Sequence, residues 1–176
     1  MTEPKTEVGK AARQLILKRT FAAPRALVFR AWTDPAMMAG WWGPRGFDTT
    51  VEADAHPGGG YAITMQGPDG TRYPMHGQFL EIVPDERLVM LDMFEEHPPE
   101  WFAELIRLRG TDKDCPKQMR LIVTFEDVQG GTLLTLVAEF ASDLDRDAFI
   151  GLGMAEGMGE SFDRLEELVT AGTPPA

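Results

Sequence analysis

The sequence predicts an α+β fold in which a long C-terminal helix packs on one face of a curved antiparallel sheet. Two patterns predict this fold. From about residue 47 to residue 140, apolar and polar residues alternate with period two, and turns containing Gly or Pro separate the runs. After residue 143, apolar residues recur at helical spacing up to about residue 170. The chain has 176 residues, 43% of them hydrophobic, which suffices for one domain with a sizeable core.

The N-terminal part predicts one strand followed by two short helices. The apolar, β-branched run QLILKRTF (14–21) indicates the strand. Pro24 suits a helix start, and apolar residues at helical spacing follow it over residues 26–32. Asp34 is a typical helix cap, and Pro35 suits the first position of a second short helix.

Six further strands follow, arranged mainly as hairpins. The turns GPDG, PDE and Gly130-Gly131 each join two alternating runs, and the glycines of HPGGG permit the positive φ angles of another turn. The predicted strands are 47–55, 61–66, 72–83, 87–95, 118–128 and 131–140.

Residues 95–117 are too long for a tight turn between two of these strands. Trp101, Leu105 and Leu108 lie at helical spacing inside this segment. Long ordered loops often cover functional sites, so we expect a lid-like insertion with a short helix.

A long C-terminal helix is expected to run to about Thr170, with Asp143 or Asp145 as its cap. Residues 13–171 are predicted to form the single domain. Residues 1–12 are polar without periodicity, and 172–176 follow the helix stop, so both are expected to be flexible.

The charge of the chain disfavours several classes of partner. The formal net charge is −11, which repels phosphate backbones and anionic membranes. The first ten residues contain no apolar run, so we expect no signal peptide, and no stretch approaches the roughly 20 apolar residues of a membrane span. A single cysteine, Cys115, fits a reducing cytoplasm. We therefore expect a cytoplasmic protein that binds neither nucleic acid nor membranes.

The stretch GLGMAEGMG (151–159) approaches the glycine pattern of dinucleotide-binding turns. In a dinucleotide-binding turn the glycines follow a strand directly, but here the preceding strand ends near Phe140, about ten residues before Gly151. Too little chain follows for a second βαβ unit, so we expect no nucleotide site at these glycines. On a helical wheel, Gly151 lies on the apolar stripe, whereas Gly153 and Gly157 share another face. Either Gly151 makes room for a ligand and the other two admit another element, or the helix is irregular until about Glu160.

The histidines and the lone cysteine do not have the spacing of a metal site or a nucleophilic site. We therefore expect no metal and no cofactor. His76 is expected to lie opposite about Glu95 on the next strand. Such a pair could act as a general base, but an exposed cross-strand ion pair would use the same residues.

Several segments together resemble one family. GWWGPRGFDTTVEADAHPGGGYAI, MHGQFLEIVPDERLVMLDMF, TFEDVQGGTLLTL and EGMGESFDRLEELV are similar to the domain named for the activator of the heat-shock protein 90 ATPase, a member of the SRPBCC (START/Bet v-like) superfamily. The resemblance covers roughly residues 14–170. It implies a helix-grip fold, with seven antiparallel strands wrapped around the C-terminal helix and a cavity between them. Members of this family often carry Trp where this chain has Met158.

The resemblance implies binding of an apolar ligand more than catalysis. We expect a small apolar or amphipathic ligand in the cavity, with residues 95–117 as a gate. The candidate ligand-binding residues, chosen from the apolar faces of the predicted strands and helix, are Trp41, Met65, Phe79, Met90, Phe94, Trp101, Gly151, Met158 and Phe162.

Two other functions stay open. A chaperone co-regulator is one, although family members that stimulate the chaperone carry another domain ahead of this one, and here about a dozen residues precede the first strand. A cyclase or hydrolase is the other, which requires His76, Asp92 or Glu95 to project into the cavity. A homodimer is also possible.

Overall fold

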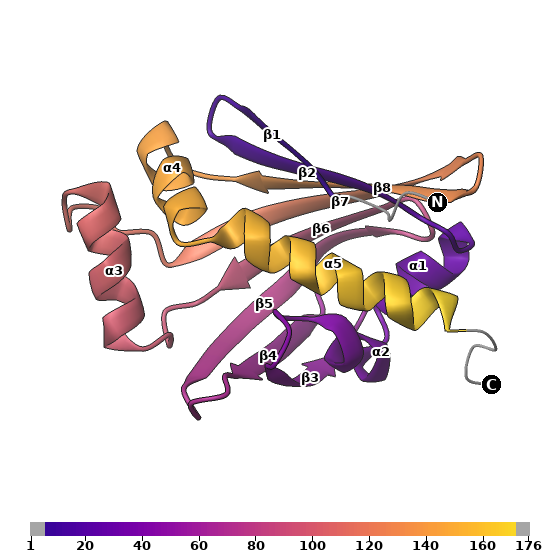
Figure 1. Ribbon diagram of the computed structural model, residues 1–176, viewed down its shortest axis with the longest axis horizontal. Coiled ribbons are helices and arrows are strands. Elements are labelled where there is room, and N and C mark those ends of the chain that lie inside the picture. The colour runs from indigo at the N-terminus through magenta and orange to yellow at the C-terminus, as the bar shows by residue number, and fades with distance from the viewer. Residues whose placement is uncertain (1–5, 172–176) are drawn as a thin grey trace.

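The computed structural model describes residues 6–171, which form one antiparallel sheet of eight strands curved around a long helix (Figure 1). The sheet order is β1-β2-β8-β7-β6-β5-β4-β3. The strands are β1 (Glu7–Ala11), β2 (Gln14–Phe21), β3 (Asp48–Ala53), β4 (Gly60–Gln66), β5 (Arg72–Val83), β6 (Arg87–Met93), β7 (Gln118–Val128) and β8 (Gly131–Glu139). This architecture fits the helix-grip arrangement.

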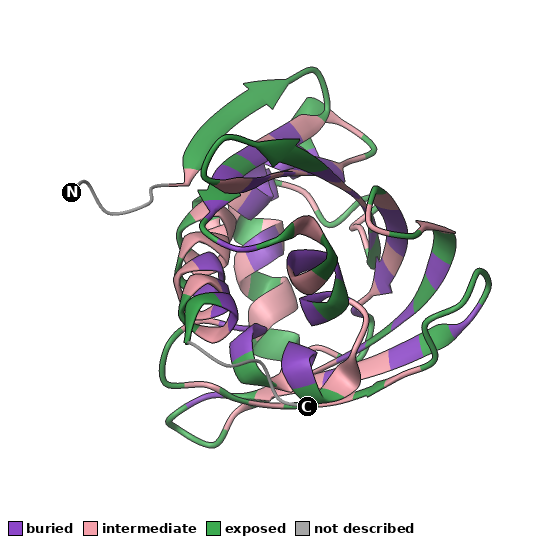
Figure 2. Cartoon of the chain, turned by 90° about the vertical axis from the view of Figure 1, so that its right-hand side faces the viewer, coloured by how far each residue is buried: buried purple, intermediate pink, exposed green. Residues whose placement is uncertain are grey.

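The strand count differs from the seven predicted, because residues 7–11 form an additional edge strand. β1 pairs with β2 from Glu7 opposite Lys18 to Ala11 opposite Gln14. Every residue of β1 is exposed, so no apolar alternation marks it in the sequence (Figure 2). Backbone hydrogen bonds alone reveal this strand, and the other seven follow the alternation that predicts them.

Five helices complete the fold: α1 (Arg25–Ala31), α2 (Pro35–Trp41), α3 (Pro99–Arg109), α4 (Asp143–Gly151) and α5 (Met154–Thr170). The side chain of Asp34 accepts a hydrogen bond from the Ala36 amide, as expected of the cap of α2. α3 lies within the insertion 95–117, where a helix is predicted. α5 crosses the concave face of the sheet, and α3 lies beside α4 at one end (Figure 1).

The C-terminal segment forms two helices and not one long helix, and the break lies in the stretch for which an irregular helix is one of the two predictions. Gly153 adopts a left-handed conformation with φ of 90°, which ends the α4 geometry and starts α5 at the next residue. The predicted caps, Asp143 and Asp145, are wrong. The hydroxyl of Ser142 caps α4 by accepting a hydrogen bond from the Asp145 amide. Asp143 and Asp145 occupy the first turn of α4, where their negative charge interacts favourably with the helix dipole.

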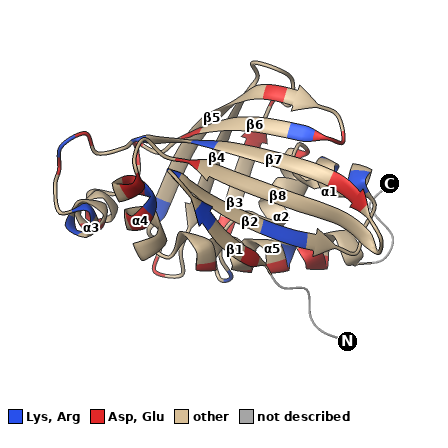
Figure 3. Ribbon diagram, turned by 90° about the horizontal axis from the view of Figure 1, so that it is seen from above, with Lys and Arg blue, Asp and Glu red and all other residues tan. Residues whose placement is uncertain are grey.

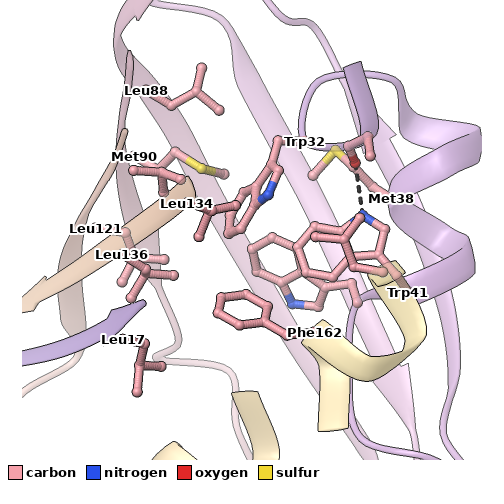
Figure 4. Packing of buried hydrophobic residues seen from close by; sticks show 14 of the residues in the cluster. Leu17, Trp32, Met38, Trp41, Leu88, Met90, Leu121, Leu134, Leu136 and Phe162 are labelled. Atoms are coloured by element: carbon pink, nitrogen blue, oxygen red, sulfur yellow. Dashed lines mark hydrogen bonds between the residues drawn. The ribbon is translucent and has the colours of Figure 1, made fainter. Parts of the chain in front are cut away.

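The densest part of the core gathers aromatic residues from α1, α2 and α5 (Figure 4). Trp32 and Trp41 lie with ring centroids 4.7 Å apart, and the Trp32 ring lies 6.4 Å from Phe162. The indole of Trp41 donates a hydrogen bond of 2.8 Å to the carbonyl of Ala31. All three side chains are fully buried, so this part of the interior between sheet and α5 is filled.

At the other end of the molecule, a buried ion pair fastens α3 to α4. Arg109 donates from Nε to Asp145 at 2.7 Å, and both side chains are under 5% exposed. The rest of the guanidinium donates to the carbonyls of Thr111 and Lys113, each at 2.9 Å. Arg109 thereby holds the end of the insertion and the start of the C-terminal helices together. No helix within residues 6–171 combines the length and apolarity needed to cross a membrane.

Candidate functional site

An apolar pocket of about 260 Å³ lies where α3, the end of α2, the end of β4 and the start of α5 meet. Its wall holds three tryptophans and three methionines: Trp41, Trp42, Trp101, Met65, Met154 and Met158. Among the described residues, no ionisable side chain lines this pocket. Thioethers and indoles form an adaptable, polarisable surface suited to apolar molecules.

Two residues of the wall, Ser161 and Gly43, use their polar groups in bonds within the protein. The hydroxyl of Ser161 accepts a hydrogen bond from the Gly43 amide and donates one to the carbonyl of Gly157, both at 3.1 Å. The carbonyl of Gly43 in turn accepts a 2.8 Å bond from Arg164. These bonds tie the loop after α2 to α5, so they fix the shape of the pocket and leave its surface apolar.

The glycines of residues 151–159 serve different purposes. Gly153 and Gly157 line the pocket, and a Cβ at Gly157 would lie 3.7 Å from Pro44, in ordinary van der Waals contact with this neighbouring wall residue. Gly151 is exposed, and a Cβ there would come within 3.2 Å of Leu108 on α3. Gly151 therefore permits the close approach of α3 to α4.

The nine predicted ligand-binding residues fall into two groups in the structure, with Gly151 apart from both. Trp41, Met65, Trp101 and Met158 come together in the wall of the pocket. Phe79, Met90, Phe94 and Phe162 are buried in the core, each less than 5% exposed. The predicted strand residues do lie on the concave face of the sheet. Most of them, however, pack against other side chains of the core and do not border the pocket.

A buried polar pair lies on the concave face, outside the wall of the pocket. Tyr61, Gly77 and Asp92 are opposite one another on three neighbouring strands, and the Tyr61 hydroxyl donates to Asp92 across Gly77. A Cβ at Gly77 would come within 1.9 Å of the Tyr61 ring, so only glycine allows this crossing. Burial raises the pKa of Asp92 to about 7, partly opposed by the Tyr61 hydrogen bond.

The residues proposed for a general-base pair do not meet as predicted. His76 lies opposite Met93, and its Nε2 contacts the carboxylate of Glu96, with both side chains at least 50% exposed. Glu95 is exposed as well. The His76–Glu96 contact is therefore an exposed side-chain contact on the outer face of the sheet, not a pair inside the cavity.

His97 is a residue of interest that sequence reasoning did not identify. Its ring centroid lies 4.7 Å from Trp101, 5.6 Å from Tyr73 and 5.7 Å from Phe94. Both ring nitrogens are buried and have no hydrogen-bond partner within the described residues. Burial lowers the pKa of His97 to about 4. Phe94 and Trp101 lie within four residues of His97 in the sequence, whereas Tyr73 comes from β5, so only folding brings the complete cluster together.

Charged residues give no sign of a metal site or a basic surface. Within residues 6–171, no three His, Cys, Asp or Glu side chains are placed to hold a metal ion. Acidic and basic positions are interspersed over the strands and helices (Figure 3).

Comparisons with known proteins agree with this fold. A family model described as "Activator of Hsp90 ATPase homolog 1-like protein" matches residues 22–170. Comparison with curated proteins finds no match.

Solved structures of bacterial proteins match along most of their length. A protein from Arthrobacter aurescens has a TM-score of 0.78 and 26% identity, covering 96% of this chain and 93% of its own. Protein Ms6760 from Mycobacterium smegmatis has a TM-score of 0.77 and 26% identity, with 97% and 100% coverage. Protein NE0264 from Nitrosomonas europaea has a TM-score of 0.74 and 27% identity, with 90% and 94% coverage.

Proposed function

The chain belongs to the family of activator of Hsp90 ATPase homologue 1-like proteins, and we propose that it binds a small apolar or amphipathic molecule without transforming it. The ligand occupies the pocket between α3, the loop after α2 and the start of α5. The protein holds or presents this molecule, and α3 acts as the gate.

The observation that carries this proposal is the composition of the pocket wall. The pocket has a volume of about 260 Å³ and an apolar wall. It lies beside a core in which Trp32 and Trp41 are fully buried. Well-packed interiors leave few voids larger than a water molecule, so an open apolar pocket favours a ligand-binding role. Trp101 belongs both to the wall and to α3, which supports a gate at this position.

The arrangement of titratable groups argues against catalysis at this pocket. His76 and Glu95 face solvent. Asp92 faces inward but is not part of the pocket wall, and Tyr61 occupies one of its oxygens. A general acid or base must come within hydrogen-bond reach of its substrate, and none of these three groups does so for a ligand in this pocket.

The binding of N-phenyl-1-naphthylamine, a neutral fluorescent probe, tests the proposal. We expect saturable binding to the wild-type protein. Gly157→Leu places a side chain in the pocket and should abolish binding. The matched control is Gly159→Leu, on the same helix, because a Cβ at Gly159 meets no atom within 4 Å. Equal affinities of the two variants would rule out this pocket as the site.

The family description supports one second candidate, a regulator of a chaperone ATPase. In that case the purified chain should stimulate the ATPase of a heat-shock protein 90 from the same organism. Gly157→Leu separates the two functions, because a surface interaction would survive filling of the pocket whereas ligand binding would not.

A further inference from the structure

Five buried side-chain atoms within residues 6–171 have no hydrogen-bond partner: Nε of Arg19, Nε1 of Trp32, Oε2 of Glu166 and the two ring nitrogens of His97. His97 is the residue in which both polar atoms of the side chain are in this state. By contrast, the buried hydroxyl of Ser161 and the guanidinium of Arg109 are bonded to neighbouring groups. A buried polar atom without a partner destabilises the folded state, so each such atom in a native structure calls for an explanation.

Packing alone does not explain a histidine at this position. The ring contacts Tyr73, Phe94 and Trp101 edge to face or tilted, as a phenylalanine ring would. A phenyl ring would keep these contacts and would bury no unpaired nitrogen. Because the pKa of His97 is about 4, the imidazole is neutral at pH 7 and offers one donor and one acceptor.

The position of His97 relates these nitrogens to the pocket. The His97 ring contacts Trp101, which is part of the pocket wall. It also contacts Tyr73, which lies opposite Met65, another wall residue, in the β4–β5 pairing. The imidazole therefore lies against one wall residue, Trp101, and against Tyr73, the strand neighbour of a second wall residue. The Trp101 ring is half-buried and belongs to α3, the proposed gate.

We propose that His97 is the polar recognition residue of the pocket, and that it pairs with a hydroxyl or amide group of the bound molecule when the Trp101 side chain turns aside. The proposal rests on the ligand-binding function proposed above and specifies the class of ligand. The ligand is uncharged, because the wall carries no ionisable side chain. It has a flat apolar body that fits between indoles and thioethers, and one neutral hydrogen-bonding group.

Two probes of equal shape test this proposal. 2-Naphthol and 2-methylnaphthalene differ only by a hydroxyl in place of a methyl group, and each can be titrated as a competitor of N-phenyl-1-naphthylamine. The wild-type protein should prefer 2-naphthol by about tenfold, because the hydroxyl satisfies a nitrogen that otherwise has no partner. His97→Phe should bind 2-methylnaphthalene normally and lose the preference. His97→Gln, which restores an amide donor and acceptor, should regain part of it.

A structural role for His97 gives a different result. If the ring only fills space, His97→Phe leaves the ratio of the two affinities unchanged. Under our proposal the ratio falls to one or below, because the phenyl ring offers the buried hydroxyl no partner. The melting temperature of the unliganded variant rises by about 3 °C under either role, because its orphaned nitrogens are gone. His56→Phe is the matched control: His56 is exposed and pairs with Asp54, so neither quantity should change.

The outcomes separate this proposal from the proposed function. If both probes bind the wild-type protein with equal affinity, or if His97→Phe keeps the preference, the role of His97 is overturned and ligand binding stands. If neither probe displaces the fluorescent ligand and that ligand itself does not bind, both proposals fail.

Discussion

The two halves of α5 face the same sheet but border different kinds of interior. In the C-terminal half, Phe162 and Leu165 are fully buried, and the Phe162 ring lies 5.9 Å from Phe21. In the N-terminal half, Gly157 and Met158 are only partly buried and line a pocket. The C-terminal half of α5 therefore contributes buried side chains that stabilise the fold, whereas the N-terminal half borders the pocket. Substitutions along the helix should separate stability from binding.

The largest effect is expected from Phe162→Ala. Removing a fully buried ring leaves a cavity between α5 and the sheet, and should lower the free energy of unfolding by about 3–5 kcal/mol. Urea denaturation followed by circular dichroism measures this change. Met158→Ala, at the half that is already open, should cost about 1 kcal/mol or less. Similar losses in the two variants would contradict the division of the helix.

Asp145→Asn tests the buried ion pair between Arg109 and Asp145, which joins α3 to α4 beside the pocket. It leaves the buried guanidinium of Arg109 without its anion, and should lower the free energy of unfolding by about 3 kcal/mol. Glu104→Gln is the control. It breaks the exposed ion pair between Glu104 and Arg107 on α3, the helix that carries Arg109, and should have no measurable effect on the free energy of unfolding. A stable Asp145→Asn variant would show that the carbonyls around Arg109 suffice to hold it.

The pH dependence of Asp92→Asn tests the buried pair on the sheet. The pKa of Asp92 is about 7 in the folded protein and 3.8 as a free side chain, so the folded state binds the proton more tightly. This contribution to stability is complete below pH 3.8 and is lost as the pH rises through 7. The variant should therefore gain stability relative to the wild type, on the order of 2 kcal/mol, as the pH rises from 4 to 8.

Two details make the Asp92→Asn measurement specific. His97 acts in the opposite sense, because its pKa is lowered to about 4 and its contribution is lost as the pH falls below about 6.5. The comparison of variant with wild type cancels this effect, since both carry His97. The control Asp127→Asn alters a carboxylate that is 72% exposed and should give a flat difference. A flat difference for Asp92→Asn would show that Asp92 titrates as an ordinary carboxyl group.

The sequence predicts the strands well because each one alternates over several residues and ends at a turn. β5 and β7 have the predicted bounds, Arg72–Val83 and Gln118–Val128. β1 lacks such a pattern, because an edge strand with all side chains exposed needs only its backbone to pair. The glycines of residues 151–159 indicate an irregular helix as one alternative, but they do not predict the exact position of the break, because the φ angle of Gly153 is not visible in a sequence.

The site was harder to predict, for a physical reason. Periodicity identifies which side chains point inward, and Met65 and Phe79 both do. It does not identify which of them meet another side chain and which meet empty space, because that depends on elements brought together only by folding. Phe79 is fully buried among core residues, whereas Met65 faces the junction of α2, α3 and α5. His97 shows the same limit, since its cluster combines Tyr73 and Trp101 from separate segments.

Met158→Trp is expected to change the free energy of unfolding least among these substitutions. It is nevertheless expected to abolish binding of the probe. Met158 is only partly buried and borders the pocket, so the larger side chain has room beside it. An indole there would fill the pocket between α5 and α3 and should abolish probe binding, while the free energy of unfolding stays within about 1 kcal/mol of the wild type. Fluorescence titration and urea denaturation of the same sample measure both quantities. Retained affinity would place the ligand elsewhere on the molecule. Lost affinity with an intact fold would identify Met158, together with Gly157, as the feature that opens the N-terminal half of α5 to a ligand.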